Sequence, residues 1–129
     1  MYDLNMKRIP FSEEALSRLQ NLRSRIIIKE NNILCRIGFC LSLEEPGAPL
    51  YPEKLDGSPI DRYTLLGSHD KTFMALLVTW MNKNGFEEIN SENLNQCFIA
   101  HMDRGAQIIS SRIKNMSDFA QLIPTNSHT

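Results

Sequence analysis

Residues 31–47, NNILCRIGFCLSLEEPG, have the order of a helix with a polar start, an apolar body and a stop at Pro46 and Gly47. The body is apolar almost all the way round, because Arg36 and Ser42 are its only polar interruptions. A helix on a protein surface has one apolar stripe and one polar face. The sequence therefore predicts that other helices, from the same chain or from a second copy, cover most of this helix.

The length of 129 residues predicts one domain, and the composition, 42% hydrophobic and 22% charged, is typical of a soluble globular protein. No apolar run approaches the length of a membrane span, and the N-terminus lacks the apolar region of a signal peptide, so we expect a cytoplasmic protein without membrane contact. The three cysteines form no CxxC pair and have no zinc-ligand spacing to a histidine, so we interpret them as reduced, buried thiols and expect no metal site.

The charges are unevenly distributed along the chain. Residues 1–36 contain seven basic and four acidic side chains, whereas residues 37–129 contain seven basic and eleven acidic ones. A polyanionic partner would therefore meet the N-terminal third of the chain.

The N-terminal part has the pattern of a short strand followed by two helices. A strand is expected within residues 4–11, and Ser12 is a helix N-cap followed by two glutamates in the first turn. Apolar residues at spacings of three and four predict a helix over 13–27, and Asn31 or Asn32 is expected to cap the helix that runs to about residue 45.

A segment rich in proline and glycine, residues 46–60, separates these helices from the C-terminal part and predicts a long loop or arm. Loops of this length in small domains wrap a neighbour or are disordered. A further helix is expected from Ser68 or Asp70 to Gly85.

The last long helix should begin at Asn90 or Ser91 and either continue to Lys114 or break near Gly105. Residues 117–123 could add a turn or two, and residues 124–129 should be irregular. The organisation predicted is one domain, residues 1–129, with a basic helix-helix unit over 1–45, a proline-rich arm over 46–60 and helices over 61–123.

The predicted fold class is mainly α, a compact helical domain of four to six helices with a short N-terminal strand. A strand followed by two basic helices is typical of a ribbon-helix-helix unit, in which the strands of two chains pair. A helical hairpin inside a monomeric core would give the same periodicity, so both interpretations stay open. In a dimer, the apolar second helix would have neighbours from both chains.

Gly38 lies in the middle of this apolar helix, where glycine costs about 1 kcal/mol relative to alanine, so it indicates close approach of another backbone. We predict that the helix forms an oligomer interface. The predicted interface residues are Ile33, Ile37, Gly38 and Leu41.

The segment AHMDRG, residues 100–105, is the only candidate catalytic group, and it is a weak one. His101 and Asp103 are two residues apart and point to different faces of a helix. A hydrogen-bonded histidine in the core or at an interface is the simpler interpretation of His101. No phosphate-binding glycine loop or nuclease-like carboxylate cluster accompanies it.

Several segments taken together resemble the DndE family of DNA sulfur modification proteins. The segments are IPFSEEALSRLQNLRSR, NNILCRIGFCLSLEEPGAP, the proline-rich arm, FMALLVTW and CFIAHMDRGAQII, and they cover about residues 8–113. The resemblance implies a small accessory subunit of DNA phosphorothioation that works with the DndC and DndD proteins, while a cysteine desulfurase supplies the sulfur. It also implies a tetramer that binds duplex DNA, with a preference for nicked duplex, through surface lysines and arginines.

The preferred hypothesis is a non-catalytic DNA-binding subunit without a cofactor. Arginines outnumber lysines in the basic N-terminal third, so the family's own basic positions are not carried over. The residues expected to contact phosphates are Lys7, Arg8, Arg18, Arg23, Arg25 and Lys29. The alternatives are a nicking endonuclease that uses His101 and Asp103, and a scaffold for the other modification proteins.

Overall fold

The computed structural model describes residues 3–121. The predicted mainly helical class is confirmed. Within residues 3–121 the chain forms six α-helices and a small two-stranded sheet. The elements are β1 (Arg8–Ile9), α1 (Glu13–Arg23), α2 (Asn31–Glu44), β2 (Ile60–Asp61), α3 (Arg62–Leu66), a 3-10 turn (Gly67–His69), α4 (Asp70–Lys83), α5 (Ser91–Arg112) and α6 (Met116–Ala120).

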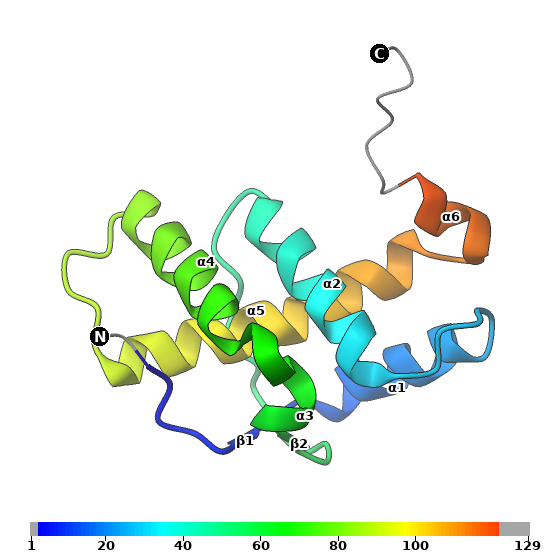
Figure 1. Ribbon diagram of the computed structural model, residues 1–129, viewed down its shortest axis with the longest axis horizontal. Coiled ribbons are helices and arrows are strands. Elements are labelled where there is room, and N and C mark those ends of the chain that lie inside the picture. Colours follow the sequence, from blue (N-terminus) through cyan, green and yellow to red (C-terminus); the bar gives the residue numbers. More distant parts are fainter. Residues whose placement is uncertain (1–2, 122–129) are drawn as a thin grey trace, which may run out of the picture.

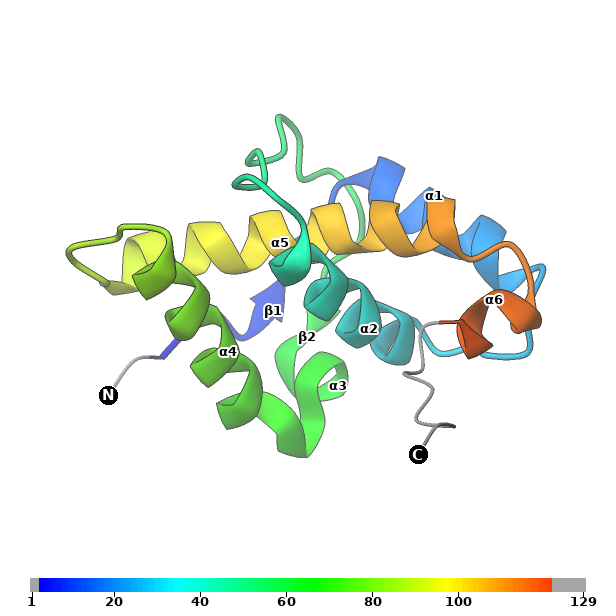
Figure 2. The same cartoon turned by 90° about the horizontal axis from the view of Figure 1, so that it is seen from above.

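Helix α5 is the axis of the fold, and the other long helices pack around it (Figures 1 and 2). Its 22 residues make it about 33 Å long. It begins with a capping box between Asn90 and Asn93 and continues through Gly105 without a break. Of the two predicted outcomes for this helix, the unbroken one is therefore correct.

The most extensive helix pairing is between α2 and α5, which cross at Gly38 and Gly105. A Cβ built on Gly38 would lie 2.6 Å from the carbonyl carbon of Gly105, and one built on Gly105 would lie 2.7 Å from the amide nitrogen of Phe39. The predicted close approach at Gly38 is real, but the partner is a helix of the same chain. Gly38 is buried there, so its assignment to an oligomer interface is corrected.

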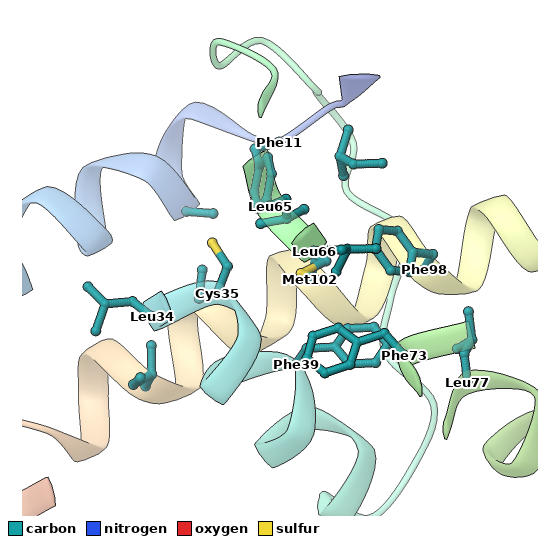
Figure 3. Close-up of a cluster of buried hydrophobic side chains, with 14 of the residues drawn as sticks. Phe11, Leu34, Cys35, Phe39, Leu65, Leu66, Phe73, Leu77, Phe98 and Met102 are labelled. Carbon is teal, nitrogen blue, oxygen red and sulfur yellow. The ribbon is translucent and has the colours of Figure 1, made fainter. Parts of the chain in front are cut away.

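Aromatic side chains fill the space between α2, α4 and α5 (Figure 3). Phe39 of α2 stacks on Phe73 of α4 with ring centroids 5.5 Å apart. The ring of Phe98 of α5 has its centroid 5.4 Å from that of Phe39. Phe11, Leu65 and other buried apolar residues extend this core towards β1 and α3. The apolar helix α2 is thus covered on one side by its own chain.

The predicted N-terminal strand is present but short, and its partner is β2 of the same chain. The two strands are antiparallel, with Arg8 opposite Asp61 and Ile9 opposite Ile60. Pro10 lacks the amide hydrogen that would continue the ladder. The pairing with a second chain's strand, which a ribbon-helix-helix unit requires, is therefore replaced by an intrachain pair.

Two predicted helix boundaries are wrong at the connection between α1 and α2. Helix α1 ends at Arg23 instead of continuing to residue 27, and the chain turns over Ser24 and Arg25 by bonds such as Arg25 N to Leu22 O at 2.9 Å. Helix α2 has Glu30 as its N-cap residue, without a side-chain hydrogen bond, rather than Asn31 or Asn32.

The proline-rich arm contains no helix or strand between Glu45 and Pro59, as predicted, but it is bound to its own chain at both ends. Near its start, Arg104 Nη1 donates to the carbonyl oxygen of Gly47 at 3.0 Å. Near its end, the Gly57 amide donates to Phe11 O at 3.0 Å and the Asp56 carboxylate accepts from the Glu13 amide at 3.0 Å. In Figure 2 the arm rises on the opposite side of α5 from α3 and α4.

The C-terminal turn predicted within residues 117–123 corresponds to α6, which is capped by Asn115. The prediction for residues 124–129 lies outside the described residues. Within residues 3–121, no helix combines the length and the apolar character that crossing a bilayer requires.

Candidate nucleic-acid interface

The six predicted phosphate contacts follow β1, α1 and the turn after α1, and we call this set the basic edge. Its members are Lys7, Arg8, Arg18, Arg23, Arg25 and Lys29. Figure 1 shows β1 at one end of α1 and the connection to α2 at the other, so the set extends along the helix rather than converging on one point. Helix α1 has 11 residues and spans about 16 Å.

Lys7 and Arg8 are the most available cations of the basic edge. Both side chains are exposed, and neither has a hydrogen bond or ion pair with any residue between 3 and 121. Their backbone is held by the β1–β2 pair and by the bond from Arg62 N to Lys7 O at 2.8 Å. Two exposed cations without a partner in the described part of the chain therefore extend from backbone that hydrogen bonds hold in place.

Arg18 is exposed on the outer face of α1 and pairs with Glu14, one turn earlier, at 3.0 Å. A surface ion pair of this kind contributes at most about 1 kcal/mol, because water and salt screen it. An anion such as a phosphate could compete with Glu14 for the guanidinium group.

The remaining three cations of the basic edge hold the turn between α1 and α2. Lys29 Nζ donates to the carbonyl oxygens of Arg23 at 2.6 Å and Ile26 at 2.8 Å. Arg25 Nη1 donates to Asn21 O at 3.2 Å, and Arg23 is half-buried with Nη1 3.5 Å from Lys29 O. The sequence pattern did not reveal this structural use of the charges.

Other basic residues bind groups of the chain itself. Arg36, the polar interruption of α2, donates from Nε to Leu65 O at 2.6 Å. Arg62 makes a bidentate pair with Asp70 at 2.7 Å, and its pKa is raised above the ordinary arginine value by that hydrogen bond. Arg112 pairs with Glu45. Arg36 and Arg62 are therefore poorly placed for a polyanion, whereas the Arg112 pair is a surface pair like that of Arg18.

His101 is completely buried in α5, where its Nδ1 lies 2.8 Å from the hydroxyl of Ser42. Arg104 donates to the same hydroxyl at 2.8 Å, so the Ser42 proton is free to go to His101 Nδ1. Burial, reinforced by the positive charge of Arg104, lowers the pKa of His101 to about 3. The imidazole is therefore neutral at physiological pH and packs edge to face against Trp80.

Asp103 is also buried, but it faces a different helix. Its carboxylate accepts from the Ser12 amide at 2.8 Å and from the Ser12 hydroxyl at 2.9 Å, and Ser12 Oγ in turn caps the Ala15 amide. His101 thus contacts Ser42 in the last turn of α2, and Asp103 binds Ser12 at the N-cap of α1. The two side chains do not form a catalytic pair. Among residues 3–121, no group of three or more histidine, cysteine, aspartate or glutamate side chains could hold a metal ion.

The cysteines are free thiols, as predicted, but only Cys35 is fully buried. Cys35 is buried, and burial raises the pKa of its thiol to about 12. Cys40 and Cys97 are half-buried, and desolvation also raises their pKa values. The three residues therefore behave as small apolar side chains rather than as nucleophiles.

Three of the four predicted interface residues remain at least partly accessible along α2. Ile33 is 37% exposed, and Ile37 and Leu41 are partly buried. They follow one another at spacings of four, so they share one face of the helix. Ile27, 76% exposed, lies in the turn that precedes α2.

The architecture defines a class of protein: a small helical domain built on one long helix, with a basic edge along its N-terminal strand and helix. A comparison with protein families matches residues 8–117 to the family described as DNA sulphur modification protein DndE. The chain belongs to the DndE family.

The fold is also similar to that of solved DndE structures. The crystal structure of DndE from Escherichia coli B7A, involved in DNA phosphorothioation modification, superposes with a TM-score of 0.61 at 22% identity, over 84% of this chain and 99% of that one. The crystal structure of a DndE mutant with glycines replaced by lysines, involved in DNA phosphorothioation, superposes with a TM-score of 0.60 at 23% identity, over 82% of this chain and 98% of that one. No curated protein matches the sequence.

Proposed function

We propose that this chain is the DNA-binding accessory subunit of a DNA phosphorothioation machinery. Membership of the DndE family supports the pathway, since the relatives of known structure are described as involved in that modification. The observation that carries the DNA contact is the pair Lys7 and Arg8, two exposed cations without an intrachain partner on a fixed strand. Such side chains bind phosphate without reading sequence.

The basic edge suits the backbone of a duplex better than a single phosphate. Its cations extend over about 16 Å of helix α1 and the flanking residues, and phosphates of one strand recur at intervals shorter than this length. Arg18 would exchange Glu14 for a phosphate, whereas Lys29, already bonded to two carbonyl oxygens, would contribute less. We extend the proposal to nicked duplex, which exposes the same phosphates on a more flexible backbone.

The test is the salt dependence of binding to a labelled duplex with and without a nick. Each phosphate contact contributes about 0.9 to the slope of log affinity against log salt, so the double variant Lys7→Ala/Arg8→Ala should lower the slope by roughly 1.8. The control is Lys71→Ala/Lys83→Ala, which removes the same charge from exposed lysines of α4. Affinity that is independent of salt, or equal losses in the two variants, would reject the proposal.

We also propose that the chain forms a homo-oligomer, a tetramer, through the accessible face of α2 formed by Ile33, Ile37 and Leu41. The support is the apolar area that stays accessible along α2, where Ile33 is exposed and Ile37 and Leu41 are only partly buried. The mass in solution by light scattering tests this. Ile33→Asp should reduce the mass, whereas Leu76→Asp, at a residue of similar exposure on α4, should not.

The partner proteins of the proposed subunit are DndC and DndD, and the site of action is the cytoplasm, where the DNA is. A pure scaffold would bind these proteins without binding DNA, so the titration above separates the two roles. A nicking endonuclease would relax supercoiled plasmid and lose that activity in His101→Ala. The burial of His101 and its contact with Ser42 speak against this second function.

A further inference from the structure

A groove lies between the arm and the body of the protein, and it shares with the basic edge only the first turn of α1, where Glu14 pairs with Arg18. It has a volume of about 660 Å³, which is within the range of specific binding sites. Arm residues 48–54 form one part of its lining, the arm wall, and the rest comes from Glu13 and Glu14 in the first turn of α1 and from Asp103, Arg104 and Gln107 of α5. We call it the arm groove.

The arm groove is preformed, because the arm is attached on both sides of it. Arg104 holds Gly47, and Phe11 and Glu13 hold Gly57 and Asp56. A Cβ at Gly57 would lie 2.6 Å from Leu16 Cδ1, so the second attachment depends on close contact. A preformed groove binds with a smaller loss of conformational freedom.

The charge of the arm groove identifies the kind of ligand. Five carboxylates and two cations line it, so it repels the phosphates that the basic edge would attract. At the start of α1, the amides of Ser12, Glu13 and Ala15 are already bonded, to Asp103, Asp56 and Ser12 respectively. Glu13 and Glu53 have no side-chain partner within residues 3–121, so two carboxylates are free to pair with a cation.

Apolar side chains at the rim distinguish a protein ligand from a small cation. Leu50 is 90% exposed and Tyr51 is 50% exposed, and both belong to the arm wall. Exposed large apolar side chains beside free carboxylates suit a chain segment that alternates basic and apolar side chains. We propose that the arm groove is a docking site for a lysine- or arginine-bearing, partly apolar segment of another protein.

The experiment uses the full chain and a labelled, end-blocked peptide of alternating lysine and leucine, followed by fluorescence anisotropy and amide chemical shifts. We expect binding that moves the resonances of residues 48–56 and of Glu13 and Gln107. A peptide with glutamine for lysine, and one with serine for leucine, should bind at least several-fold more weakly. Shifts confined to other residues would overturn the proposal.

Matched variants complete the test. Glu13→Gln/Glu53→Gln should weaken binding of the lysine peptide about tenfold, whereas Glu87→Gln/Glu88→Gln, the same charge change at exposed residues outside the groove, should not. Leu50→Ser should weaken binding of the lysine peptide several-fold. Ile27→Ser, at an exposed apolar residue outside the groove, should leave this binding unchanged. Equal effects in either pair would overturn the proposal, and so would a fall in the mass of the protein in Leu50→Ser, which would assign the groove to a second copy.

Discussion

Gly38 of α2 and Gly105 of α5 touch backbone to backbone, and this contact sets the distance between the two helices with the most extensive pairing. Each glycine occupies the position that a Cβ on the other would need. A contact between two backbones cannot be relieved by rotating a side chain.

Gly38→Ala should therefore lower the free energy of unfolding by about 2 kcal/mol or more, although alanine has the higher helix propensity. Urea denaturation measures the effect. Ser17→Ala, on the exposed face of α1, is the control and should leave stability unchanged or slightly raised. A Gly38→Ala protein as stable as the parent would contradict the crossing.

Asp103 and Ser12 should be energetically coupled, because the carboxylate binds both the amide and the hydroxyl of Ser12. Asp103→Ala leaves the partly buried amide unpaired, so we expect a loss of about 2–3 kcal/mol of stability. A double-mutant cycle with Ser12→Ala should give a coupling free energy of about 1 kcal/mol or more. Additive losses would show that the two side chains act independently.

The stability should depend on pH through His101. Its folded pKa of about 3 lies below the ordinary value of 6.5, so the unfolded chain binds a proton that the folded chain does not. The contribution of neutral His101 to the free energy of unfolding is complete above pH 6.5. It is lost as the pH falls towards 3, at up to about 1.4 kcal/mol per pH unit.

Denaturation at several pH values would measure this loss. The His101→Gln protein should lose less stability between pH 6.5 and 4 than the parent, while His69→Gln, at an exposed histidine, should follow the parent curve. Identical curves for His101→Gln and the parent would place the acid sensitivity on other groups.

Arg62 fastens the segment before β1 to the start of α4. Its Nη1 donates to Leu4 O at 3.1 Å, and its Nε and Nη2 bind Asp70. Arg62→Lys keeps the charge but loses the bidentate geometry, so we expect a loss of about 1–2 kcal/mol. Hydrogen exchange should quicken at residues 4–9 and stay unchanged in the middle of α5. Unchanged exchange in the N-terminal segment would contradict this role.

The long helices could be predicted because their apolar residues recur at helical spacing and their ends carry recognisable residues. Gly85 follows α4 with a φ of 84°, and Asn90 caps α5. The sequence does not show the early end of α1, because Ile26 and Ile27 continue the helical spacing of apolar residues. In the structure these residues lie in a turn, where Lys29 Nζ donates to the carbonyl oxygen of Ile26. Helix α3 was missed because five residues are too few to show a period.

The candidate site was predicted only in part. Net charge located the basic edge, but sequence alone does not show that Lys29 holds two carbonyl oxygens while Lys7 is free. The sequence indicated that His101 and Asp103 point to different faces of a helix, but it did not identify their partners, Ser42 and Ser12. Such partners come from segments distant in the chain, which periodicity does not reveal.

Because the arm is attached to the body at both ends, a change in its middle can leave both attachments and the packing of the helices in place. Lengthening a closed loop costs little conformational entropy, about 0.6 kcal/mol for each doubling of its length. Residues 48–54 can therefore be exchanged or extended during evolution without changing the helical body. The arm is thus a segment that can change in length at little cost to the stability of the helical core.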